Sequence, residues 1–227
     1  MKVIRYIHEW KNEKNNTVFY TYPMIHIGIE DYYNEISNEI KKLDYLLTEG
    51  VPFVRGDIGK YQKIANKLQL SSQKKSLQLP PDMKIKNIDI DSELFIKSTK
   101  QLKIRDKIQF ISMRIFFQFP FFFKKEKILI TIKTLLSYPE NKEYILKNPL
   151  KHYAFKHKEK SSFDLLIQNT RDEIINKNLE EIIEENKNRE YRYDIGILFG
   201  DEHMPYIYQT LHKNEYKWKF LKEVTVM

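Results

Sequence analysis

The sequence predicts an α/β protein: a mixed central sheet built from both termini, flanked by helices, with a helical insertion in the middle. The two ends of the 227-residue chain are rich in β-branched and aromatic residues, which favour strands. The middle, from about 92 to 186, carries mainly helical spacing of apolar residues. Tyr193–Phe199 is a nearly continuous apolar run, typical of a central strand. We expect one domain, residues 1–227, with the insertion at about 92–160.

The N-terminal part of the chain alternates between strand and helix patterns. Two runs rich in Val, Ile and Tyr flank the polar segment Lys11–Asn16, which predicts a β-hairpin. Apolar residues at three- and four-residue spacing then predict amphipathic helices. Ser71–Pro81 is expected to be a polar loop closed by two prolines. The expected strands are Lys2–Trp10, Thr17–Ile25, Tyr45–Thr48 and Lys84–Ile90, and the expected helices are Ile29–Leu43 and Asp57–Leu70.

The C-terminal part begins with long helical patterns and ends with strands. Pro120 interrupts the first helical pattern, because proline lacks a backbone donor and clashes with the preceding turn. Ser161 or Ser162 can cap a long helix that runs to about Asn186. The expected elements are helices at Ser92 to about Phe119, Lys125–Tyr138, Glu140–Lys147, Ser162–Asn186 and Met204–Lys213, a basic loop at Pro149–Ser161, and strands at Tyr193–Phe199 and Tyr216–Met227.

The composition excludes several chemistries. The chain has no cysteine, so disulfides, thiolate nucleophiles, cysteine-ligated zinc and iron–sulfur clusters are excluded. Its six glycines form neither a glycine-rich dinucleotide loop nor a P-loop. The formal net charge is +8, but most of the 39 basic residues are lysine, whereas arginine is favoured for bidentate recognition of phosphates and bases. We therefore favour a generic basic surface over a nucleic-acid partner.

The chain shows no targeting or membrane-spanning signal. Met1–Trp10 carries several charged residues, unlike a signal peptide. The longest apolar run, Ile108–Phe123, contains Arg114 and Pro120 and is shorter than the roughly 20 residues needed to span a bilayer. We therefore expect a cytoplasmic protein. The aromatic part of this run, 115–123, is either a buried helix end or an exposed patch that contacts a partner protein or a membrane surface.

Three of the expected strands end in residues suited to catalysis. His26 follows the second strand, Glu49 follows the third, and His203 lies just beyond Tyr193–Phe199. In open α/β sheets, ligands and reacting groups gather at the carboxyl ends of the strands. Two histidines and one carboxylate are a common catalytic metal set, and a glutamate can also act as general base on a bound water. Each histidine could equally be a structural residue, and spacing alone does not show that the three converge.

Arg171 is also unusual in its position. It lies four residues after Ile167 and four before Ile175, which places it near the apolar face of the long helix. A buried arginine needs a carboxylate or a ligand anion, although a surface ion pair or a snorkelling side chain would explain it too. Asp172 lies beside it in the helix. Asp89 follows a strand-like run and either approaches the same sheet edge or caps the next helix.

Four segments, in this order, resemble sequence elements of the TraB/Tiki family. In that family a strand ends in a GxxH motif, an amphipathic helix follows, and the next strand ends in Glu-Gly. A helix then carries an Arg-Asn/Asp motif, and a second GxxH precedes a helix and the terminal strand. The matching segments are Met24–Gly28, Leu46–Val51, Asn169–Ile174 and Ile197–Pro205, and the resemblance covers about 22–51, 165–176 and 195–216.

The resemblance implies a fold shared with the erythromycin-esterase-like and ChaN-like proteins, and one cleft faced by His26, Glu49, Arg171 and His203. Tiki-type members are tied to metal-dependent proteolysis, whereas other members act in pheromone shutdown or have no assigned activity. By this resemblance, His26 and His203 would bind a divalent metal such as Mn²⁺, Co²⁺ or Zn²⁺. Glu49 would be a metal ligand or the general base, and Arg171 would bind a carboxylate or stabilise an oxyanion.

The leading hypothesis is therefore a metal-dependent hydrolase, of the peptidase type, that acts on a peptide or small molecule through a metal-activated water. One departure from the family is Pro23, which replaces the glycine of the first GxxH motif and has no N–H to donate. The second motif, Gly200–His203, is intact. Pro23 and the aromatic run 115–123 motivate a second hypothesis, a non-catalytic binding or regulatory protein. A third is a protein that binds nucleic acid or a membrane surface through its lysines.

Overall fold

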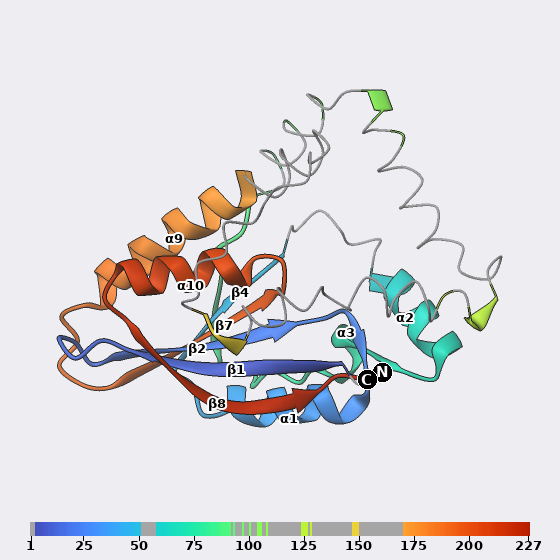
Figure 1. Ribbon diagram of the computed structural model, residues 1–227, viewed down its shortest axis with the longest axis horizontal. Helices are drawn as coiled ribbons and strands as arrows, with labels where there is room; N and C mark the ends of the chain where they lie inside the picture. The colour runs from blue at the N-terminus through green and yellow to red at the C-terminus, as the bar shows by residue number, and fades with distance from the viewer. Residues whose placement is uncertain are drawn as a thin grey trace.

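The computed structural model describes residues 3–50, 58–91 and 170–227, together with single positions and short runs between 93 and 149 (Figure 1). The helical insertion expected at about 92–160 lies mostly outside the described residues, and the aromatic run 115–123 lies wholly outside them. The strands are β1 (Ile4–Lys11), β2 (Thr17–Met24), β3 (Ile27–Gly28), β4 (Tyr45–Thr48), β5 (Ser71–Ser72), β6 (Lys84–Asn87), β7 (Tyr193–Gly200) and β8 (Lys217–Thr225). The helices are α1 (Glu30–Ile40), α2 (Ile58–Leu68), α3 (Gln73–Ser76), α9 (Thr170–Asn186) and α10 (Met204–Lys213).

Six strands form one mixed sheet in the order β6-β4-β7-β2-β1-β8. The four strands β6, β4, β7 and β2 run parallel to one another, whereas β1 pairs antiparallel with both β2 and β8. The sheet therefore combines strands from both ends of the chain, which confirms the predicted α/β class. In the parallel half, Thr48 lies opposite Leu198, and Met24 lies opposite Gly200. The carboxyl ends of β4, β7 and β2 thus meet at one edge of the sheet.

Helices cover both faces of the sheet. α9 and α10 lie over one face and α1 over the other (Figure 1), as expected when the side chains of each strand alternate between two buried faces. In β7, Ile195, Ile197 and Phe199 pack toward α9 and α10, whereas Leu198 packs toward α1. Gly196 lets the side chain of Leu43 pack closely against β7, since a Cβ at position 196 would lie 2.5 Å from Leu43 Cδ1.

The bounds of several predicted elements agree closely with the structure. The bounds of β4 and α10 agree with those expected, and α2 and β7 differ by one or two residues at an end. The helix predicted at Ile29–Leu43 is longer than the observed α1, which ends at Ile40. The predicted loop Ser71–Pro81 instead begins with β5 and α3. β5 pairs with β3 in a separate two-stranded sheet, and two-residue strands carry no periodicity that a sequence could reveal.

The described helices are short or amphipathic. Within the part of the chain that the structure describes, none is both long enough and apolar enough to cross a bilayer. α9 is the longest of the helices whose bounds are given, with 17 residues, and its exposed side carries Lys177 and several glutamates. Its buried side chains, including Ile175, Leu179 and Ile182, pack on the sheet.

Candidate functional site

Five charged side chains from four elements meet at the carboxyl ends of the parallel strands. Glu49 directly follows β4, Asp89 follows β6, and His203 lies in the turn between β7 and α10. Arg171 and Asp172 belong to the first turn of α9. We call these five residues the strand-end cluster. The parallel order β6-β4-β7 brings the first three together, and the packing of α9 on α10 and the sheet adds the other two.

Arg171 holds two carboxylates of the strand-end cluster. Its Nη2 donates to Glu49 Oε1 at 2.9 Å and its Nε donates to Asp89 Oδ1 at 2.9 Å. Nη2 also donates to Asp89 Oδ2, so the guanidinium grips Asp89 with two nitrogens, the geometry that arginine favours with carboxylates. The Asp89 side chain is fully buried, and that of Arg171 is 14% exposed. The apolar-face position read from the sequence is thus explained by paired carboxylates.

His203 lies between the Asp172 carboxylate and the Glu49 carboxylate that Arg171 also holds. Its Nδ1 is 2.6 Å from Asp172 Oδ1. Because an ionised carboxylate can only accept, Nδ1 carries the proton and donates it. On the far side of the ring, Nε2 lies 3.6 Å from Glu49 Oε1, which is longer than a hydrogen bond. The second oxygen of Glu49, Oε2, accepts the backbone N–H of Gly200 at 2.5 Å.

These contacts set the charges of the facing pair. Burial by itself lowers the pKa of His203, but the hydrogen bond to Asp172 and the nearby Glu49 carboxylate raise it from 6.5 to about 9. Burial alone would raise the pKa of Glu49, but His203, Arg171 and the Gly200 N–H together hold it well below its ordinary value. At neutral pH, an imidazolium therefore faces a carboxylate.

His26, the remaining residue implied by the resemblance, lies elsewhere. Its side chain is exposed, its ring stacks on that of Tyr61 with centroids 4.4 Å apart, and its Nδ1 is 3.3 Å from Gln73 Oε1. Pro23, at the position of the missing glycine, is buried in β2, and its carbonyl accepts the hydroxyl of Tyr32 at 2.6 Å. Within the described residues, the structure brings three of the four predicted site residues together and places His26 against α2 and α3.

Two members of the cluster, Asp172 and Asp89, were not predicted as site residues. Asp172 stands beside Arg171 in the sequence but 31 positions from His203, and Asp89 is 82 positions from Arg171. For Asp89, the strand-like run before it was consistent with a position at the sheet edge, but a role as the cap of the next helix explained the residue equally well. Asp172 carried no signal beyond its neighbour.

The fit of the cluster to a metal ion depends on the donors it offers. Glu49 Oε1 and His203 Nε2 present two adjacent donor atoms, and Asp172 orients the histidine as carboxylates commonly do around metal ligands. Among the described residues, however, no three histidine, aspartate or glutamate side chains are arranged to hold a metal ion. The described residues therefore supply two donors of the predicted set rather than three.

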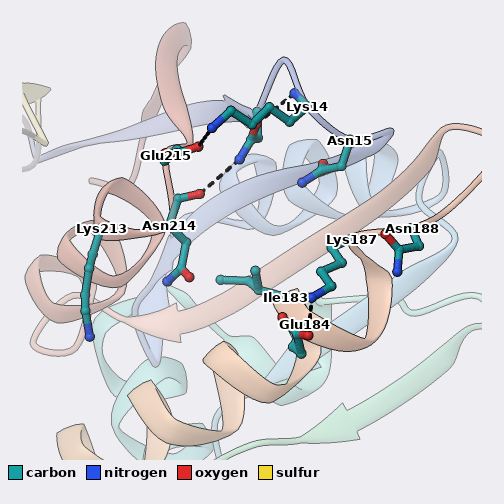
Figure 2. Close-up of a pocket in the computed structure, with 10 residues that line it drawn as sticks. Lys14, Asn15, Ile183, Glu184, Lys187, Asn188, Lys213, Asn214 and Glu215 are labelled. Carbon is teal, nitrogen blue, oxygen red and sulfur yellow. Dashed lines mark hydrogen bonds and ion pairs between the residues drawn. The ribbon is translucent and has the colours of Figure 1, made fainter.

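A pocket of about 400 Å³ lies at the opposite end of the sheet (Figure 2). It is formed by the β1–β2 hairpin and by the ends of α9 and α10. Each of its three lysines pairs with a glutamate, in the pairs Lys14–Glu215, Lys187–Glu184 and Lys213–Glu180. The charge of each pocket lysine is thus balanced by a neighbouring carboxylate.

Comparison of the chain with models of protein families, with curated proteins and with solved structures finds no match. The geometry of the strand-end cluster is therefore the main evidence on function. Three of its side chains (Glu49, Arg171 and His203) were selected from the sequence by their positions at strand ends and on a helix face. Their contacts generate two predictions that need no knowledge of a substrate.

The first prediction concerns stability and pH. The pKa of His203 is about 9 in the folded protein, above the ordinary 6.5, so its protonation stabilises the fold fully below pH 6.5 and this contribution is lost as the pH rises through 9. In metal-free buffer, the free energy of unfolding in urea should fall by on the order of 3 kcal/mol over this range. His203→Gln should flatten the profile, whereas His212→Gln, at an exposed histidine in α10, should not. A flat wild-type profile would contradict the buried imidazolium.

The second prediction concerns Gly200. A Cβ at this position would lie 2.8 Å from Glu49 Oε2, so Gly200→Ala must displace the carboxylate from His203. We expect the pKa of His203, followed by NMR titration, to fall by at least about one unit. Gly50→Ala is the matched control, because the nearest atom to its Cβ would be Asn87 Nδ2 at 3.7 Å. An unchanged His203 titration in Gly200→Ala would show that the carboxylate is not held where the structure has it.

Proposed function

We propose that the chain is a hydrolase whose reaction takes place at the strand-end cluster. The observation that carries this proposal is the facing pair of His203 Nε2 and Glu49 Oε1, 3.6 Å apart. Each is fixed from behind, His203 by Asp172 and Glu49 by Arg171 and the Gly200 N–H. The shifts hold His203 as the protonated donor and Glu49 as the ionised acceptor at neutral pH, which are the protonation states that an acid–base pair needs before reaction.

Hydrolysis requires one proton to leave water and another to reach the leaving group. The Glu49 carboxylate can accept the water proton as the oxygen attacks, and the His203 imidazolium can deliver its Nε2 proton to the departing atom. Asp172 keeps the imidazole in the orientation that points Nε2 at Glu49. After release of the products, the proton on Glu49 returns to His203, which restores the resting ion pair.

Arg171 supports this chemistry through its charge and its grip on Glu49. With both Asp89 and Glu49 bound to its guanidinium, it fixes the Glu49 carboxylate. Its positive charge also lies next to Glu49 within the cluster, where it would stabilise an oxyanion intermediate. The resemblance to the TraB/Tiki family supports a substrate with a peptide or ester bond, as an analogy of fold and motif.

The hydrolase proposal predicts a selective loss of activity. Wild-type protein would be screened on peptide and ester substrates, and kcat/KM measured on any that is cleaved. Glu49→Gln and His203→Gln should each lower kcat/KM at least about 100-fold, because each removes a proton-transfer group. The matched controls are Glu39→Gln, which pairs with Lys42 and Lys222, and His212→Gln. Equal activity in all four variants would reject the cluster as the active site.

A second candidate is the metal-dependent form of the same hydrolase. It is favoured by the carboxylate–histidine contact of Asp172 and His203, which resembles the support of metal-binding histidines. His203 and Glu49 would hold the ion, and a bound ion would supply an activated water at neutral pH. His26 would have to leave Tyr61 and Gln73 to join them.

Thermal unfolding distinguishes the two forms. A ligand that binds only the folded protein raises the apparent Tm. The acid–base form predicts no rise with Mn²⁺, Co²⁺, Zn²⁺ or Ni²⁺ and hydrolysis that survives EDTA. The metal-dependent form predicts a rise in the wild type that is absent in His203→Ala, and hydrolysis that EDTA abolishes. A rise that persists in His203→Ala would place the metal outside the strand-end cluster.

A further inference from the structure

A second buried ion pair lies beside the strand-end cluster. Arg5 of β1 pairs through Nε with Asp201, the first residue after β7. The two side chains are 4% and 1% exposed. In the sheet, β2 lies between β1 and β7, so the pair connects two strands that are not neighbours. Arg5 is also anchored on its own strand, where Nη1 donates to the carbonyl of Ile4 at 2.8 Å.

Stability alone is a weak reason for such a pair. Removing two charges from water costs several kcal/mol per ion, and apolar residues of similar size often stabilise as well or better. A buried ion pair does, however, hold its two partners close together, because opposite charges attract more strongly where little water screens them. The question is therefore what Arg5 and Asp201 hold in place.

The answer lies in the turn that contains Asp201. Gly200 and His203, on either side of it, supply the two groups that approach the oxygens of Glu49. The turn is closed by the His203 N–H, which donates to the Gly200 carbonyl at 3.0 Å. Within it, the side chain of Asp201 is buried, whereas that of Glu202 is exposed. Asp201 is thus a buried side-chain anchor of the turn between its two contacts with Glu49.

We infer that Arg5 and Asp201 are positioning residues for the strand-end cluster. Their ion pair holds the β7–α10 turn in the position in which the Gly200 N–H and the His203 imidazole both approach the Glu49 carboxylate. The catalytic consequence of this inference rests on the proposed hydrolase, whereas the positioning itself does not. Neither residue contacts the reacting atoms, so both act through His203 and Gly200.

The test removes the ion pair without unfolding the chain. The double variant Arg5→Met/Asp201→Leu replaces two buried charges by apolar groups, a change that buried ion pairs often tolerate. The matched control is Thr17→Val, which breaks the buried hydrogen bond from Thr17 Oγ1 to the Asn186 carbonyl at the opposite end of the sheet. The spectroscopic readout is the NMR resonance of the His203 Nδ1 proton, which the 2.6 Å contact with Asp172 should move downfield.

We expect the double variant to lose or shift this resonance, and Thr17→Val to retain it at equal or lower stability. If the wild type hydrolyses a substrate, kcat should fall at least about tenfold in the double variant, with a much smaller change in KM. Arg5→Lys, which keeps the charge but loses the planar fork, serves as the second variant if the double variant does not fold. It should shift the same resonance.

A folded variant with the wild-type resonance and the wild-type kcat would overturn the inference and leave the pair a purely structural one. A wild-type protein without hydrolytic activity would reject the proposed function, yet the resonance would still decide whether Arg5 and Asp201 position His203. The two failures are therefore distinguishable. Asp201→Asn adds a single-site check, because the amide keeps the shape of the side chain but not its charge.

Discussion

The Glu49 carboxylate imposes the constraint on which the arrangement of this end of the molecule depends. Taking a carboxylate out of water costs several kcal/mol unless charged and hydrogen-bonding partners replace the water. Here the partners are Arg171, His203 and the Gly200 N–H. They come from α9, from the β7–α10 turn and from the end of β7. The contacts of this one carboxylate therefore require β4, β7, α9 and the turn before α10 to keep fixed positions relative to one another.

The members of the strand-end cluster form a series of contacts in which negative and positive side chains alternate. In order they are Asp172, His203, Glu49, Arg171 and Asp89, so each cation lies between two carboxylates. Removal of one member leaves its neighbours buried and incompletely paired, which is more costly than the loss of a single contact. Stability and the proposed chemistry thus depend on the same contacts, and an activity assay alone would not separate them. The resonance of His203 and the matched controls are needed for that reason.

The sequence was most informative about features that are local. The strands β4 and β7 and the helix α10 follow from local patterns of apolar residues, and the rule that sites form at strand ends selected Glu49 and His203. The helix-face position of Arg171 indicated burial, but its partner Asp89 could not be identified because the two are 82 positions apart. Asp172 and the pairing of β3 with β5 were missed for the same reason. Long-range pairing depends on the whole topology, which no window of residues contains.

The two GxxH-like segments differ in a way that the structure explains in part. In the second segment, Gly200 lets Glu49 approach the backbone, since a Cβ would collide with its carboxylate. The first segment has Pro23 at the corresponding position, so it can offer neither that close approach nor an N–H donor. Consistent with this difference, His203 joins the strand-end cluster, whereas His26 packs on Tyr61. The glycine of the motif therefore has a physical meaning here: it admits a carboxylate to the strand end, and the histidine three residues later meets that carboxylate from the other side.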